Sequence, residues 1–176
     1  IDTFIDSSIG PKKGQVGIVD KSFMTSGQEG KRIAKVRIRA ERIPKIGDKF
    51  CSRAGQKGTI GLILSEKDMP CTADGIRPDI IVNPHAMPSR MTIGQLYEMQ
   101  AGNYCARKGT HIDATIFKKI NIDQLSNELE SIGMNKHGYH RLYSGITGEY
   151  IDCMIFMGPT YYQRLQKFVI DSIYSV

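Results

Sequence analysis

Glycine and proline divide this chain into short segments. The 176 residues include 18 Gly and 7 Pro, and the apolar residues between them alternate or recur only over short stretches. Both residue types favour turns and interrupt regular elements. Many short strands with irregular links, and only three helix candidates, favour a closed or nearly closed β-barrel with attached helices over a doubly wound sheet. The predicted fold class is therefore mixed α/β, mainly β.

Alternating side chains predict the strands. A short strand is expected over 15–21, and with the next strand it would form a hairpin at the edge of the fold. Over 34–40, apolar residues would line one face and basic residues the other, which predicts a half-buried strand with a basic outer face. Further strands are expected over 60–64 and 80–82, with a hairpin around Gly145 and Gly148.

Three segments have helical spacing, and the stretch before the first of them, 83–91, is expected to be irregular. Thr92 and Gln95 match a capping box, so a helix is expected from Ile93 to about Ala101. A second apolar stripe runs over 122–132 and ends at a glycine. A last amphipathic helix is predicted from four apolar positions at helical spacing: Tyr162, Leu165, Val169 and Ile173.

Composition narrows the class of protein. A hydrophobic content of 40% can close a core without disulfides, and no apolar run is long enough for a membrane helix, so no membrane partner is expected. The four cysteines are too far apart for a zinc motif and are expected to be reduced. A net charge of +6 is consistent with a polyanionic partner and equally with solvated lysines. Because the chain begins with Ile1 and ends within an expected helix, we expect a piece of a longer polypeptide; the alternative is a processed small protein.

The segment GDKFCSRAGQKG concentrates cations among glycines. Lys49 and Lys57 stand with Arg53 and Gln56 in a predicted strand-to-strand loop, where side chains and backbone N–H groups can approach phosphate oxygens. The order of residues is not that of a Walker A loop. From these residues alone, a solvated basic turn is the favoured interpretation.

Arg90 follows two prolines and precedes the expected helix start at Ile93. A guanidinium held in this way suits bidentate phosphate recognition, although an ordinary bracing arginine fits equally well. The carboxylates are scattered, and the HGYH histidines have no third ligand nearby, so no metal site is predicted.

Several segments together resemble one protein family. RIPKIGDKF, CSRAGQKGTIG, KDMPCTADGIRPDIIVNPHAMPSRMT and IFMGPTYYQRL occur in this order, and similar segments occur in the same order in the second-largest subunits of cellular and large-DNA-virus RNA polymerases. SRMT and GPTYYQRL resemble the archaeal, eukaryotic and viral branch. The sequence departs from the family pattern at Ala54, where the family commonly has His.

The resemblance implies a hybrid-binding domain over 1–176, a fragment of a longer subunit built around a double-psi β-barrel. It implies that Lys49 and Lys57 contact phosphates of the RNA 3′ end or the incoming nucleotide and that Arg90 contacts the triphosphate, with Arg53 and Gln56 as further nucleic-acid-binding residues. The implied enzyme is a DNA-directed RNA polymerase, a nucleotidyltransferase in which this chain is inactive alone. Mg²⁺ would be held by the largest subunit and not by this chain.

The implied partners are the largest subunit and other polymerase subunits, the DNA template, the RNA transcript and nucleoside triphosphates. The expected location is the nucleus or the cytoplasm, or a viral factory or virion if the protein is viral. The alternative function is a non-catalytic module that grips an RNA–DNA duplex by its backbone. A third interpretation is a small scaffold with solvated lysines.

Overall fold

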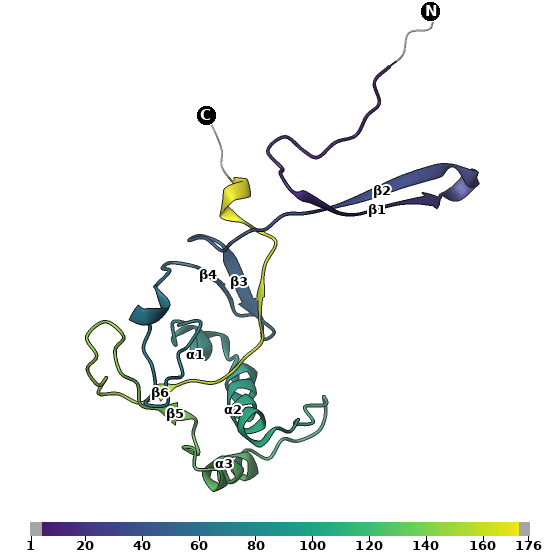
Figure 1. Ribbon diagram of the computed structural model, residues 1–176. Coiled ribbons are helices and arrows are strands. Elements are labelled where there is room, and N and C mark those ends of the chain that lie inside the picture. Colours follow the sequence, from purple (N-terminus) through teal and green to yellow (C-terminus); the bar gives the residue numbers. More distant parts are fainter. Residues whose placement is uncertain (1–4, 173–176) are drawn as a thin grey trace, which may run out of the picture. The chain divides into compact units, whose positions relative to one another are not determined.

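The computed structural model describes residues 5–172 and divides into two compact units, within Ile1–Pro44 and within Lys45–Val176 (Figure 1). Helices and strands both contribute, so the mixed α/β prediction is confirmed. None of the helices in this part of the chain combines the length and the apolar character that crossing a membrane requires. The four cysteines are free, as expected.

The first unit is built on one antiparallel hairpin. Strand β1 (Ile18–Ser26) pairs with β2 (Arg32–Arg39) across a tight turn that contains the short 3-10 helix η1 (Gln28–Gly30). The predicted hairpin is confirmed. The predicted half-burial of its second strand is wrong, because every residue of β2 is exposed and Val36 keeps 58% of its surface. Alternation correctly predicted two chemically different faces, but no other described element of the first unit covers either of them.

The second unit contains a three-stranded antiparallel sheet in the order β4–β3–β7. Its strands are β3 (Lys49–Ser52), β4 (Lys57–Thr59) and β7 (Tyr162–Arg164). The sheet joins segments more than 100 residues apart, and Figure 1 shows the yellow C-terminal strand beside β3. The glycine-rich segment was predicted to be a loop between strands over 34–40 and 60–64. It instead contains β3 and β4 themselves, and both of its lysines lie within these strands.

A second pairing joins β5 (Tyr139–His140) to β6 (Ile155–Phe156). Between these strands the chain reverses, and Tyr143 and Tyr150 form an antiparallel bridge. The turn needs glycine at position 148, where φ is +73°. The predicted hairpin around Gly145 and Gly148 is therefore confirmed at its tip.

Three α-helices complete the unit: α1 (Ala86–Arg90), α2 (Ile93–Lys108) and α3 (Ile122–Ser131). Helix α1 lies where an irregular stretch was predicted; Pro88 is tolerated there because the first turn of a helix needs no backbone donor. Helix α2 begins where predicted but continues to Lys108. Asn121 caps α3 by accepting from the Gln124 N–H.

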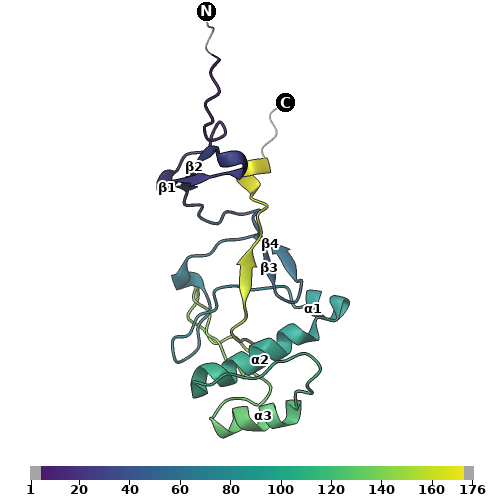
Figure 2. The same ribbon diagram turned by 90° about the vertical axis from the view of Figure 1, so that its right-hand side faces the viewer.

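Helices α2 and α3 pack against each other through a small apolar core. Leu129 is completely buried and Leu125 nearly so, and both contact Tyr104 of α2. Figure 2 shows the two helices side by side at the end of this unit. The stripe that predicted α3 is the face that it buries.

Three predicted elements are wrong. The segment 60–64 leaves the sheet after Ile60, whose N–H donates to the Asp48 carbonyl, and Leu62 is then 69% exposed. The segment 80–82 is also exposed and forms no strand. The last predicted helix is instead β7 followed by the 3-10 helix η3 (Val169–Ser172), because pairing with β3 overrides local helical spacing; Ile173 of that prediction lies outside the described residues.

The strands of residues 5–172 form three small sheets that do not close into a barrel. The double-psi β-barrel that the resemblance implies therefore stays a prediction.

Candidate functional site

Lys49 and Lys57 lie on the same face of the three-stranded sheet. Lys49 pairs with Thr59 and Cys51 pairs with Lys57, and residues directly opposite in an antiparallel ladder share a face. The two lysines are therefore diagonal neighbours, a relationship that places Cα atoms roughly 7–8 Å apart. Within residues 5–172, neither ammonium group has a hydrogen-bond or ion-pair partner. Two like charges are thus held close together with nothing in this part of the chain to neutralise them.

The opposite face of the same strand is bound to helix α2. Ser52, one residue after Cys51, donates its hydroxyl to the Gln95 side-chain oxygen at 3.0 Å, and both residues are 1% exposed. A buried polar pair of this kind fixes register, since each partner satisfies the other. Gln95 thus fixes one face of the strand to α2, and the two lysines lie on the other face.

The connection 53–56 is anchored to α2 by an ion pair. Arg53 Nη2 lies 2.6 Å from Glu98 Oε1, and the same oxygen accepts from the Tyr161 N–H at 2.9 Å. The Arg53 guanidinium also stacks over the Tyr161 ring, 5.2 Å from its centroid. Burial raises the pKa of Glu98, but the hydrogen bonds from Tyr161 and Arg53 outweigh it and hold the pKa below its ordinary value. The structure therefore gives Arg53 an internal partner.

Gln56 joins the same connection to α1. Its amide nitrogen donates to the Ala86 carbonyl at 3.0 Å and to the Thr92 hydroxyl, and its oxygen accepts from Arg90 Nη1 at 2.8 Å. The side chain is 5% exposed, so its hydrogen-bonding groups are directed inward. Arg90 is itself exposed and uses one guanidinium nitrogen for this bond. Arg90 is thereby fixed beside the residue that precedes Lys57.

Asp48 fixes the beginning of β3. Its carboxylate accepts from Arg164 of β7, from the Val169 N–H at 2.9 Å and from the Lys45 N–H at 3.1 Å. The Val169 hydrogen bond is the main cause of a lowered pKa at Asp48, and the bonds from Lys45 and Arg164 add to it against the raising effect of burial. The residue next to Lys49 is therefore held to two later segments of the chain.

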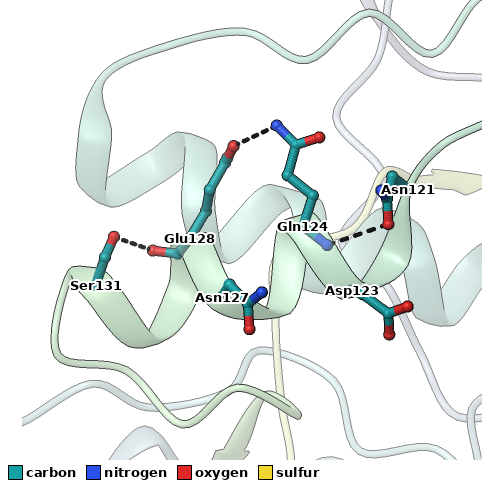
Figure 3. A pocket seen from close by; sticks show the side chains of 6 residues that line it. All are labelled: Asn121, Asp123, Gln124, Asn127, Glu128 and Ser131. Atoms are coloured by element: carbon teal, nitrogen blue, oxygen red, sulfur yellow. Dashed lines mark hydrogen bonds between the residues drawn. The ribbon is translucent and has the colours of Figure 1, made fainter.

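A shallow hollow of about 490 Å³ lies along α3, away from these cations in sequence (Figure 3). Its lining is polar and carries negative charge: Asn121, Asp123, Gln124, Asn127, Glu128 and Ser131. A hydrogen bond from Gln124 is the main cause of a lowered pKa at Glu128, which keeps that carboxylate charged. An anionic lining repels phosphate, so this hollow is not the candidate site.

Two carboxylates lie beside the residues of the cationic site, and an arginine engages each of them. Asp48 is engaged by Arg164 and Glu98 by Arg53. Among residues 5–172, no three His, Cys, Asp or Glu side chains gather closely enough to hold a metal ion.

Sequence reasoning missed the residues that hold the site together. Gln95 and Thr92 were interpreted as a capping box, yet Thr92 makes no side-chain cap. Gln95 instead binds Ser52 at the end of β3, and Thr92 binds Gln56 in the connection that follows. Glu98 gave no signal, because its partner Arg53 is 45 positions away. A polar residue on the inner side of α2 was the available clue, since buried polar groups need partners.

Comparison of the sequence with known proteins shows which family this chain belongs to. The family model described as RNA polymerase Rpb2, domain 6, matches residues 2–176. The chain belongs to the Rpb2 domain 6 family. DNA-directed RNA polymerase II subunit 2 of Arabidopsis thaliana is 50% identical over 97% of the chain, and subunit Rpo2 of Saccharolobus shibatae is 48% identical over the same share. A viral relative, DNA-directed RNA polymerase subunit 2 of Acanthamoeba polyphaga mimivirus, is 48% identical over 90% of the chain.

This Rpb2 domain 6 chain spans about one seventh of the length of these relatives: 14% of the Arabidopsis protein, 15% of the Saccharolobus protein and 13% of the mimivirus protein. The resemblance to the archaeal, eukaryotic and viral branch is thus confirmed.

Proposed function

We propose that this chain forms part of the active centre of a DNA-directed RNA polymerase, in which Lys49, Lys57 and Arg90 bind phosphate groups. Its relatives are named as subunits of such polymerases. The observation that carries the proposal is the pair of unneutralised lysines on one face of a sheet whose other face is fixed to α2. Preorganised cations of this kind stabilise negative charge without a reorganisation cost at the moment of reaction.

Nucleotide addition places that charge on phosphate oxygens. The 3′-hydroxyl of the RNA attacks the α-phosphate of a nucleoside triphosphate, and pyrophosphate leaves. Lys49 and Lys57 would face the phosphates at the RNA 3′ end or the α-phosphate. Arg90 would bind the triphosphate, because only one of its guanidinium nitrogens donates to Gln56 and the others remain available. Gln56 and Arg53 would serve this site by holding Arg90 and the connection in place, rather than by touching nucleic acid.

The metal would come from a partner. Mg²⁺ neutralises developing charge in phosphoryl transfer, and the carboxylates near these cations are already engaged by arginines. We therefore assign Mg²⁺ to the largest subunit. DNA template, RNA transcript and nucleoside triphosphates are the proposed ligands, other polymerase subunits the proposed partners, and the nucleus or cytoplasm, or a viral factory or virion, the proposed location.

In this proposal, residues 1–176 belong to the hybrid-binding region. The sheet β4–β3–β7 would contribute to a double-psi barrel that strands from the rest of the subunit complete. The open strands and the exposed apolar residues support this, because they lack the cover that a closed fold would give them.

The decisive test is Lys57→Ala in the assembled polymerase that carries this sequence. We expect the rate of single-nucleotide addition to fall by roughly 100- to 1,000-fold, the usual effect of losing one donor to a developing oxyanion, while the RNA–DNA hybrid stays bound. Lys67→Ala is the matched control, since Lys67 is an exposed lysine in the 3-10 helix η2 (Glu66–Asp68), outside the site. Weakened hybrid binding at an unchanged rate would instead support the gripping module, and no change in either would support the scaffold.

A further inference from the structure

The positive charge of this chain is concentrated in its first quarter. Residues 1–44 contain nine Lys or Arg and five Asp or Glu, a net charge of +4, whereas the whole chain carries +6. The described part of this segment is the β1–β2 hairpin and its flanks, and none of the residues that we assign to phosphate binding lies in it. This charge therefore needs an explanation separate from the candidate site.

The strand register places four of the five cations in β1 and β2 on one face. Arg39 pairs with Ile18, Arg37 with Lys21, and Lys35 with Phe23, so these side chains share a face. We call Lys21, Lys35, Arg37 and Arg39 the basic face. An irregularity in the register between Val19 and Lys21 brings Lys21 onto this side.

The cations of the basic face are accessible and mostly unpaired. Arg37 forms an exposed ion pair with Asp20 at 3.2 Å, and Lys21 lies over the Phe23 ring at 5.8 Å. Lys35 and Arg39 have no ion-pair partner among residues 5–172. Because alternate residues of a strand are about 6.6 Å apart, Lys35, Arg37 and Arg39 form a row roughly 13 Å long. The fourth cation of β2, Arg32, pairs with Ser26 and lies on the opposite face.

The opposite face has a different character. Val19 pairs with Ile38 and Met24 with Ala34, and Val36 continues this apolar surface. Met24 and Val36 are 64% and 58% exposed. Apolar faces of this size are normally covered by protein, and the relatives of this chain are about seven times longer. Covering the apolar face would leave the basic face as the outer surface of the hairpin.

We infer that the basic face binds the phosphate backbone of duplex nucleic acid, through residues other than those of the candidate active centre. A row of cations with regular spacing matches a regular array of phosphates, and the contact needs no base sequence. A single strand would be a poorer occupant, since single-strand sites stack successive bases on aromatic rings. Phe23 is the one aromatic residue in β1 and β2, and Lys21 already lies over it.

The first test neutralises the basic face in the full-length protein, purified in the complex that it forms. The variant is Lys21→Gln, Lys35→Gln and Arg39→Gln together, which leaves the Arg37–Asp20 pair intact. Three lost phosphate contacts should make the slope of log Kobs against log salt less steep by about 2.7 and weaken duplex binding roughly 10- to 100-fold. The control, Lys12→Gln, Lys13→Gln and Lys31→Gln, removes the same charge outside the basic face and should leave both quantities almost unchanged.

An equal effect of both triple variants, or no effect of either, would overturn the inference, because net charge alone or nothing at all would then be responsible. A larger effect on single-stranded than on duplex ligand would also overturn it. Nucleotide-addition rate at saturating template should stay normal in the basic-face variant. It should fall in Lys57→Ala, so the two proposals fail separately.

The second test uses photo-crosslinking from opposite faces. A photoreactive amino acid at position 23, on the basic face, should crosslink to duplex DNA, whereas one at position 24, on the apolar face, should crosslink to protein. Crosslinks from position 23 to protein alone would overturn the inference without any need for a charge variant to fold normally.

Discussion

Arg90 donates a 2.8 Å hydrogen bond to the side-chain oxygen of Gln56, a residue that is itself almost fully buried. The Gln56 amide is fixed at its other end by Ala86 and Thr92, so it cannot rotate without breaking further bonds. An exposed arginine normally samples many rotamers, and ordering it on binding costs affinity. The buried amide removes part of that cost in advance. The sheet connection and the short helix α1 thus act together on a single guanidinium.

Gln56→Ala should therefore imitate the loss of Arg90. Removing a hydrogen bond to a charged group costs about 1.5–3 kcal/mol, which corresponds to a roughly 10- to 100-fold rise in the KM for nucleoside triphosphate. Combining Gln56→Ala with Arg90→Ala should add little to Arg90→Ala alone, because both act through one guanidinium. Steady-state kinetics of the polymerase measure this. Ser89→Ala is the control, since the Ser89 hydroxyl bonds only to backbone carbonyls of its own helix; full additivity would show that Gln56 acts by another route.

The ion pair between Arg53 and Glu98 allows a test of whether Arg53 anchors the connection or binds nucleic acid. If Arg53 serves as an anchor, Arg53→Gln and Glu98→Gln break the same contact and should alter activity in the same direction, each by less than about tenfold for a pair exposed on one side. If Arg53 instead binds nucleic acid, Glu98→Gln would release it and strengthen hybrid binding. Hybrid dissociation rates of the two variants at several salt concentrations distinguish these outcomes, and we expect matching changes.

The sequence predicted the parts of the site but not how they meet. The turn within the glycine-rich segment, and the start of α2, follow from local rules of turns and spacing. The pairing of β3 with β7 does not, because it joins Cys51 to Gln163 and no local pattern encodes a partner so far away. For the same reason Tyr162 was placed in a helix: its apolar spacing fits one, and only tertiary pairing makes it a strand.

The exposed hairpin shows a second kind of limit. Alternation in β2 correctly separates Val36 and Ile38 from Arg37 and Arg39, yet burial depends on what packs against a face. A piece that spans 14% of a relative lacks most of the chain that could provide such cover. The alternation of residues in a strand shows which face is apolar, but it does not show what protein segment covers that face.

Asp48 should make the sheet sensitive to acid. Its folded-state pKa is lowered, so its contribution to stability is fully present above the unfolded value near 3.9 and is lost as the pH falls through the lower folded-state value. Asp48→Asn should increase hydrogen exchange at the Leu165 N–H, which donates to the Lys49 carbonyl, at neutral pH. The difference from the unsubstituted protein should begin to shrink below about pH 4, because the unfolded state then takes up a proton that the folded state still resists. It should vanish once the pH is low enough to protonate the folded carboxylate as well.

Asp6→Asn is the control for Asp48. The pKa of Asp6 is also lowered, but its cause is local, namely hydrogen bonds from the Ser8 hydroxyl and N–H. Asp6→Asn should therefore leave exchange at Leu165 unchanged at every pH. A pH-independent difference for Asp48→Asn would show that the lost contact is not the charged one.

Two glycines of helix α2 should respond to alanine in opposite directions. At Gly94 nothing lies within 4 Å of an added Cβ, so Gly94→Ala should stabilise the helix by about 0.5 kcal/mol through reduced backbone entropy in the unfolded state. At Gly102 an added Cβ would come within 2.8 Å of Pro159 Cγ and 2.9 Å of its carbonyl oxygen. Gly102→Ala should therefore destabilise by roughly 1–3 kcal/mol, because backbone must shift to admit the methyl group. Hydrogen exchange of the α2 amides in the full-length protein measures both changes. Equal effects at the two positions would mean that the segment 157–160 does not pack on α2. The contact of Tyr161 with Glu98, which Arg53 also binds, would then be contradicted as well.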